Sequence, residues 1–251
     1  MFKNFIEQFV FFPQKEIQKT PQSIGLGYED IYLENNHGWF IGNKKKNVHK
    51  SIKNKVILFF HGNAGNIGFR LNYIKKFNEI GFSLLFFDYP GFGYSKGSPS
   101  EETCVNTGIL YYQFLLKLFP HENIIFYGES IGGAIAANVA NKFHAKHLIL
   151  QSTFTDIKQI IKNLLVTNYL NYFIGNIGFE TIKYLQYRHR LNILEKKMKT
   201  FIIHSNNDEI IDISFAMELE KYADGLCITN GTHSNIEFND DLIYQILKFI
   251  G

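Results

Sequence analysis

The chain alternates short runs of β-branched and aromatic residues with longer stretches in which apolar residues recur at helical spacing. Six short runs are apolar throughout, which is typical of strands buried on both faces of a parallel sheet. These runs are Val56–Phe60, Leu84–Phe87, Ile124–Tyr127, Leu148–Leu150, Phe201–Ile203 and Leu226–Ile228. The alternation predicts an α/β fold with a mostly parallel central sheet and helices on both faces.

Turn and cap signals add detail to this fold. Residues Tyr28–Leu33 and Trp39–Ile41 predict an antiparallel hairpin, with Asn36-His37-Gly38 as its turn. The run Ser98-Pro99-Ser100-Glu101 predicts the start of a helix, with a serine cap, a proline in the first turn and a carboxylate three residues later.

The alternation stops between Phe154 and Lys197, where apolar and aromatic residues continue without a strand-like run. A length of 251 residues suits one sizeable core, so we expect a single domain over 1–251. Within it, residues 155–197 are predicted to form a small inserted helical lid over an apolar substrate. A helix pair that only packs on the body would have the same pattern, and both interpretations stay open.

The sharpest local motif is Gly128-Glu129-Ser130-Ile131-Gly132, directly after the apolar run Ile124–Tyr127 and before a helical stretch. A serine on a tight turn between a strand and a helix has its hydroxyl exposed at the edge of the sheet. The glycines permit the close backbone packing that this turn requires. Ser130 is therefore the candidate nucleophile.

A serine hydroxyl needs a base that takes its proton, and the base needs a carboxylate that holds its tautomer. Asp208 follows the predicted strand Phe201–Ile203, and His233 follows the last predicted strand. The carboxyl ends of parallel strands meet at one edge of a sheet. We therefore expect Asp208 as the acid and His233 as the base beside Ser130.

Other residues compete for these roles. Glu209 and Asp156 are alternative acids, and Asp208 could instead cap the helix predicted near Ile213. His61 and His204 also end strands, but the first lies in the loop after Phe60 and the second precedes the acid.

Acyl transfer also needs donors for the negative oxygen of the tetrahedral intermediate. The segment 61–66 follows the first parallel strand, and Asn63 is predicted to offer its backbone N–H there. The backbone N–H of Ile131, after the nucleophile, is the second predicted donor of this oxyanion hole. A glycine-rich turn that only enters a helix is the alternative interpretation of segment 61–66.

Six segments together resemble one known family. They are HGNAGN, FDYPGFGYSKGSPSEE, GESIGGAIA, LILQSTFTD, HSNNDEIID and GTHSN. In this order they resemble the α/β-hydrolase branch that holds the ABHD-type depalmitoylating enzymes and the bud-emergence (BEM-type) hydrolases. The resemblance runs from about Tyr28 to the C-terminus. It implies the α/β-hydrolase fold and the same triad, Ser130, Asp208 and His233.

Composition excludes several classes of partner. A net charge of +3 without a basic stripe argues against nucleic acid. Cys104 and Cys227 match no metal or redox spacing, which predicts two buried thiols, no metal site and a cytoplasmic location. Segment Phe2–Pro13 resembles neither a signal peptide nor a spanning helix. Its apolar stripe is expected to pack on the domain, with a weak peripheral membrane contact, there or at the lid, as the alternative.

The sequence thus predicts a serine hydrolase that cleaves carboxylic esters or thioesters of a small-molecule or acylated substrate through an acyl-enzyme, without a cofactor. A peptidase or amidase, or an acyltransferase, would use the same residues. A non-catalytic binding module on the same fold is the alternative from another class.

Overall fold

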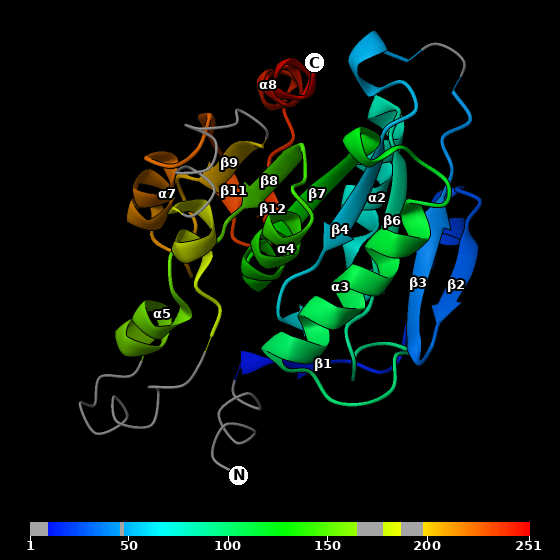
Figure 1. Ribbon diagram of the computed structural model, residues 1–251, viewed down its shortest axis with the longest axis horizontal. Helices are drawn as coiled ribbons and strands as arrows, with labels where there is room; N and C mark the ends of the chain where they lie inside the picture. The colour runs from blue at the N-terminus through cyan, green and yellow to red at the C-terminus, as the bar shows by residue number, and fades with distance from the viewer. Residues whose placement is uncertain (1–9, 46–47, 165–177, 187–197) are drawn as a thin grey trace.

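A computed structural model describes residues 10–45, 48–164, 178–186 and 198–251 (Figure 1). Its centre is an eight-stranded sheet in the order β10-β9-β8-β7-β4-β6-β3-β2. The strands are β2 Glu29–Leu33, β3 Asn36–Ile41, β4 Val56–Phe60, β6 Ser83–Phe87, β7 Ile124–Glu129, β8 His147–Gln151, β9 Lys199–Ser205 and β10 Gly225–Thr229. All six runs predicted as strands are strands of this sheet.

Strands β10 to β6 are parallel, and β3 and β2 are antiparallel additions at one edge. Two small sheets pair β1 (Phe12–Pro13) with β5 (Ala64–Gly65) and β11 (Gly231–Thr232) with β12 (Asn235–Ile236). The loops after β4, β7, β9 and β10 all leave the same edge of the sheet, because these strands run in one direction.

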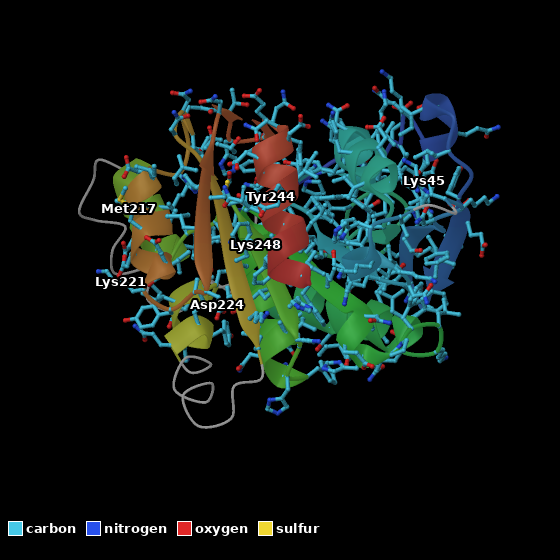
Figure 2. All side chains as sticks on the ribbon, turned by 90° about the horizontal axis from the view of Figure 1, so that it is seen from above. Lys45, Met217, Lys221, Asp224, Tyr244 and Lys248 are labelled. Carbon is cyan, nitrogen blue, oxygen red and sulfur yellow. The ribbon has the colours of Figure 1, made fainter. Side chains whose placement is uncertain are left out.

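Helices cover both faces of the sheet, as predicted. They are α2 Leu71–Ile80, α3 Glu101–Leu115, α4 Ile131–Lys142, α5 Ile157–Leu164, α7 Ile213–Glu220 and α8 Asp240–Ile250, with short 3-10 helices at Pro21–Ile24, Lys50–Ile52, Ile67–Arg70 and His121–Asn123. In Figure 1, α3 and α4 lie in front of the sheet and α2 lies behind it. Figure 2 shows strands between α7, which carries Met217, and α8, which carries Tyr244.

Two hydrophobic clusters form the core, one on each face of the sheet. The first contains buried residues of α3, α4 and α7, and the second contains those of α2 and α8. Strand β4 contributes to both, because Leu58 belongs to the first cluster and Phe59 to the second. The ring of Phe59 stacks on Phe86 at 4.3 Å and on Tyr127 at 5.2 Å between centroids. The high aromatic content of the chain is therefore used inside the core.

The hairpin turn differs from the prediction. Leu33 pairs with Asn36, so the turn is Glu34-Asn35, and Asn36-His37-Gly38 lies inside β3. Glu34 adopts a positive φ of 53°. The physical reason is tertiary: β3 packs so closely against β6 that a Cβ at Gly38 would lie 3.0 Å from the Cβ of Phe87. The glycine serves strand packing instead of the turn.

The start of α3 was also placed too early. Ser100, not Ser98, is the cap: its Oγ accepts from the N–H of Thr103 at 3.1 Å. The Thr103 hydroxyl oxygen in turn accepts from the N–H of Ser100 at 2.8 Å. This reciprocal pair decides between two serines that both suit a cap.

Strand β10 was expected to be buried on both faces, yet Ile228 is 42% exposed. It lies at the edge of the sheet, where β9 is its neighbour on one side. Cys104 and Cys227 are both buried, as predicted.

Much of the predicted lid over 155–197 lies outside the described residues, so the lid and the single-domain assignment stay predictions. The described parts include α5 and residues 178–186, and both contact the body, because Ile157, Phe179 and Leu185 belong to the first hydrophobic cluster. The N–H of Phe179 donates to Glu101 of α3 at 3.0 Å, and Asn138 of α4 donates to the Tyr184 hydroxyl at 2.8 Å. In the described part of the chain, no helix is long and apolar enough to cross a membrane.

Candidate active site

Ser130 occupies the sharp turn between β7 and α4, with φ 55° and ψ −123°. A non-glycine residue in this region is strained, by about 1–3 kcal/mol, and such strain is found mainly at functional sites. Glycine is required on both sides, because a Cβ at Gly128 would lie 2.5 Å from the carbonyl oxygen of Gly132, and a Cβ at Gly132 would collide with that of Phe60. The Ser130 N–H donates to Gln151 at 2.9 Å, and the Thr153 hydroxyl donates to the Ser130 carbonyl at 2.8 Å. These bonds hold the turn.

The three residues predicted as a triad lie together. The Nε2 of His233 is 3.0 Å from the Oγ of Ser130, and its Nδ1 is 2.8 Å from Oδ2 of Asp208. An ionised carboxylate only accepts hydrogen bonds, so Nδ1 carries the proton that it donates to Asp208. The neutral imidazole then presents the lone pair of Nε2 to the serine hydroxyl. This is the tautomer that proton abstraction requires.

The carboxylate of Asp208 is stabilised in its ionised form. Burial raises the pKa of Asp208, but hydrogen bonds from His233 and from the N–H groups of Ile211 and Ile210 outweigh this effect and lower the pKa below its usual value. Those N–H groups donate to Oδ1 at 2.8 and 3.0 Å. Asp208 therefore remains charged near neutral pH.

The loop that carries His233 is a tight turn between β11 and β12. Glu209 holds it, since Oε2 of Glu209 accepts from the main-chain N–H of His233 at 3.0 Å. The two adjacent carboxylates thus bind different groups of His233: Asp208 binds its imidazole and Glu209 binds its main-chain N–H. From the sequence, Glu209 is predicted only as a competing acid, and its hydrogen bond with the His233 main chain is not predicted.

The other competitors make different contacts, although His204 lies beside the triad, with its Nε2 3.7 Å from Oδ2 of Asp208. Asp156 accepts from the N–H of Lys158 at 2.8 Å at the start of α5, and Asp212, not Asp208, caps α7. His204 is buried, and its Nε2 is 2.9 Å from the carbonyl oxygen of Ile211. His61 is buried with Nε2 3.5 Å from Asp88.

The predicted oxyanion donors lie at two neighbouring strand ends. Ile131 is the first residue of α4, and the N–H groups of the first turn of a helix have no carbonyl partner within it. Asn63 lies in the loop after β4, beside β7. Gly132 of α4 packs so closely that a Cβ there would collide with the carbonyl oxygen of Phe60. The loop after β4 and the start of α4 are therefore in contact.

The segment that contains β1 forms hydrogen bonds with Asn63 that the sequence does not predict. The Asn63 side chain donates to the carbonyl oxygen of Val10 at 3.0 Å, and its main-chain carbonyl accepts from the N–H of Phe12 at 2.8 Å. Phe11 is buried against Phe92 and Phe179. Pairing of two-residue strands across fifty positions leaves no hydrophobic period, so no local signal could predict it.

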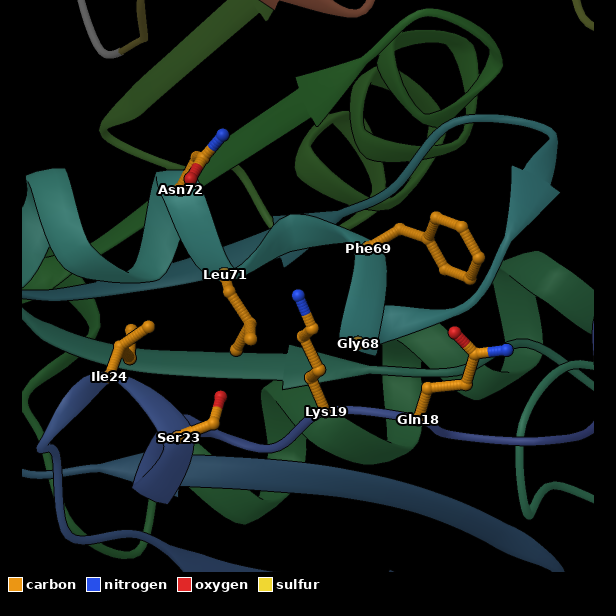
Figure 3. Close-up of a pocket in the computed structure, with 8 residues that line it drawn as sticks. All are labelled: Gln18, Lys19, Ser23, Ile24, Gly68, Phe69, Leu71 and Asn72. Carbon is orange, nitrogen blue, oxygen red and sulfur yellow. The ribbon is translucent and has the colours of Figure 1, made fainter.

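A surface cavity of about 410 Å³ lies elsewhere, next to the N-terminus of α2 (Figure 3). Exposed side chains such as Lys19, Ser23 and Asn72 line it. None of its lining residues belongs to the triad. Among the described residues, no group of three His, Cys, Asp or Glu side chains could hold a metal ion.

Residues 55–177 match a family described as alpha/beta hydrolase fold. An uncharacterized protein of Acanthamoeba polyphaga mimivirus is 30% identical over 77% of this chain and 71% of its own length. The chain belongs to the α/β-hydrolase fold family.

Two further relatives confirm the resemblance to the ABHD and BEM branch. Lysophosphatidylserine lipase ABHD12 of Danio rerio is 28% identical over 78% of this chain and 54% of its own length. Protein bem46 of Schizosaccharomyces pombe is 33% identical over 60% of this chain and 53% of its own length. The chain therefore spans about half the length of these two relatives. Lipases among the relatives support a hydrolase activity.

Solved structures share the fold. An alpha-beta hydrolase from Vibrio vulnificus superposes with a TM-score of 0.72 at 18% identity, over 98% of this chain and 91% of that one. The Pyrococcus furiosus esterase Pf2001 gives 0.71 at 15% identity, over 96% of this chain and 100% of that one. The predicted α/β-hydrolase architecture is confirmed.

Proposed function

We propose that this chain is a serine hydrolase that cleaves carboxylic esters or thioesters through an acyl-enzyme. The observation that carries the proposal is the imidazole of His233, which has Nε2 at 3.0 Å from the Ser130 hydroxyl and Nδ1 at 2.8 Å from Asp208. Nucleophile, base and orienting acid stand at hydrogen-bond distance, which is the geometry of serine acyl transfer.

The reaction uses each group in turn. Oγ of Ser130 attacks the carbonyl carbon while Nε2 of His233 takes the hydroxyl proton, and Asp208 stabilises the imidazolium that forms. The N–H groups of Asn63 and Ile131 receive the negative oxygen of the tetrahedral intermediate. The imidazolium then protonates the leaving alcohol or thiol. Water attacks the acyl-enzyme by the same route and releases the acid.

Hydrolysis of esters or thioesters is preferred to the other reactions of the same triad because of the names of similar proteins. ABHD12 is named a lipase and Pf2001 an esterase, and both names describe ester hydrolysis by those proteins. Peptidases, amidases and acyltransferases use the same groups, but no observation in the described residues favours them.

The test is labelling and turnover of the wild type and Ser130→Ala. We expect a fluorophosphonate probe to label the wild type, and p-nitrophenyl esters of graded chain length to be hydrolysed. Ser130→Ala should lose labelling and at least about 10³-fold in kcat. Ser23→Ala, an exposed serine, is the matched control and should behave as the wild type.

Each other outcome has a meaning. Labelling without ester or thioester turnover would favour an amidase or a peptidase. Absence of labelling in the folded protein would favour the non-catalytic binding module. Wild-type turnover in Ser130→Ala would refute the proposal.

A further inference from the structure

A buried ion pair contacts the loop that carries Asn63, the predicted oxyanion donor. The Nε of Arg70 is 3.0 Å from Oε2 of Glu129, and the two side chains are only 10% and 5% exposed. Glu129 is the residue before Ser130, at the end of β7, and Arg70 precedes α2. The pair therefore joins the nucleophile turn to an element on the back face of the sheet.

Both members also bind the main chain of the loop that carries Asn63. Oε2 of Glu129 accepts from the N–H of Gly62 at 3.2 Å. One Nη of Arg70 donates to the carbonyl oxygen of Ala64 at 2.7 Å and, more weakly, to that of Asn66 at 3.5 Å. Gly62 and Ala64 are the two residues that flank Asn63. The ion pair thus fixes the chain on both sides of the predicted donor.

The loop is in close contact with the pair. A Cβ at Gly62 would lie 3.1 Å from an Nη of Arg70 and 3.5 Å from the Glu129 carboxyl carbon. A glycine at this position is what lets the backbone approach both charged groups.

Stability alone gives a weak reason for such a pair. Desolvation of two charges offsets most of their attraction, and apolar residues of similar volume are often equally stable in their place. Unlike apolar side chains, the ion pair forms directional hydrogen bonds. The donors of Arg70 and the acceptor of Glu129 hold the peptide groups of the loop in one orientation.

We propose that Arg70 and Glu129 are positioning residues that hold the Asn63 N–H at the distance from Ser130 that the oxyanion requires. The proposal rests on the proposed serine hydrolase function and adds two residues to its machinery. Neither residue touches the reacting atoms. Their effect passes through Gly62, Ala64 and the turn at Ser130.

The test uses Arg70→Met, which keeps an unbranched side chain up to the position of Nε and removes all the hydrogen-bond donors. Because the tetrahedral oxygen is bound more strongly than the substrate carbonyl, we expect kcat to fall about 10- to 100-fold while KM changes less than about threefold. The inhibition constant of a trifluoromethyl ketone, which forms a tetrahedral adduct with serine, should rise by a similar factor. Lys75→Met is the matched control, because Lys75 forms an exposed pair with Glu79 on α2.

A second variant separates positioning from stability. Arg70→Met leaves the Glu129 charge buried without its partner, which lowers Tm. The double variant Arg70→Met with Glu129→Gln removes that charge, so Tm should recover while kcat stays low. If the double variant does not fold, Arg70→Lys gives the same measurement, since it keeps the charge and loses the planar guanidinium that donates to Glu129 and Ala64 from two separate nitrogens.

The two proposals fail differently. Wild-type turnover that does not depend on Ser130 would refute the serine hydrolase function before any positioning variant is made. Ser130-dependent turnover with wild-type kcat in folded Arg70→Met, or recovery of kcat together with Tm in the double variant, would refute the positioning role alone.

Discussion

Two buried carboxyl groups near Ser130, those of Asp208 and Asp88, have pKa values shifted in opposite directions. Asp208 is held ionised by two backbone N–H groups and by His233. Asp88, also buried near the loop after β4, is in the opposite state: burial raises its pKa to about 8. One carboxylate has donors around it and the other has few, so burial has opposite outcomes.

Asp208→Asn tests the orienting carboxylate. An amide can accept from His233 only weakly and can offer its own N–H, which favours the wrong imidazole tautomer. We expect kcat to fall about 10³- to 10⁴-fold, with little change in KM. Steady-state ester hydrolysis measures this effect. Asp212→Asn is the control, because an asparagine also caps α7 well, and equal activity in both variants would contradict the role of Asp208.

Asp88→Asn should change the pH dependence of stability. The folded chain keeps the Asp88 proton up to about pH 8, whereas the unfolded chain releases it near its ordinary pKa. The contribution of protonated Asp88 is therefore complete below about pH 4 and is lost as the pH rises to about 8, by up to about 1.4 kcal/mol per pH unit. The asparagine does not titrate, so the variant should gain in Tm on the wild type between pH 5 and 8.

Thermal unfolding at pH 5, 6.5 and 8 measures this difference. Besides burial, Asp88 is affected by a hydrogen bond from the N–H of Ile67 at 2.9 Å and by the more distant cations of Arg70 and Lys15, and Nε2 of His61 lies 3.5 Å away. Asp212→Asn serves again as the control, because the pKa of Asp212 is lowered and its titration ends below this range. Parallel Tm curves for wild type and Asp88→Asn would show that the Asp88 pKa is ordinary.

At the scale of elements, the loop after β4 is held from two directions. The buried side chains of Arg70 and Glu129 form hydrogen bonds with its main chain, and strand β1 pairs with β5, which belongs to the same loop. Parallel strands of two residues have little stability of their own. The loop conformation therefore depends on contacts between segments that are far apart in the sequence.

Phe12→Pro tests the outer contact. Proline removes the N–H that donates to the carbonyl oxygen of Asn63, while the Phe12 side chain is 56% exposed and makes little packing. We expect kcat to fall about 3- to 10-fold and stability to drop about 1 kcal/mol, which is the net value of one hydrogen bond. Phe12→Ala keeps the N–H and should retain wild-type kcat. Equal kcat in both variants would mean that β1 does not act on Asn63.

At the scale of the whole molecule, the sheet joins two hydrophobic clusters through the same strands. Leu58 and Phe59 are adjacent on β4 and fully buried on opposite faces. Disruption of one face must therefore strain the other. This arrangement supports the predicted single domain.

Cooperative unfolding tests that prediction. Trp39 is the only tryptophan and lies in the same cluster as Phe59. Leu58→Ala, on the opposite face, should destabilise the protein by about 2–5 kcal/mol. In urea, Trp39 fluorescence and far-UV circular dichroism should shift together in this variant. Separate midpoints for the two signals would show that the faces unfold independently.

The sequence alone was sufficient for the parallel strands, the helices on both faces and the three residues that meet at the sheet edge. Each of these depends on a local signal: an apolar run, a helical spacing, or a motif directly after a strand. Parallel strands bring their ends together, so order along the chain was enough to place Ser130, Asp208 and His233 as neighbours.

Tertiary structure decided between alternatives that the local sequence permits equally. Both Ser98 and Ser100 suit a cap, and only the Thr103 hydroxyl selects Ser100. Gly38 suits a turn, yet the close approach of β6 places it in a strand. The contacts of Arg70 with Glu129 and of Val10 with Asn63 join residues more than fifty positions apart. Their directions depend on the packed backbone, because hydrogen bonds require specific distances and angles that no sequence period encodes.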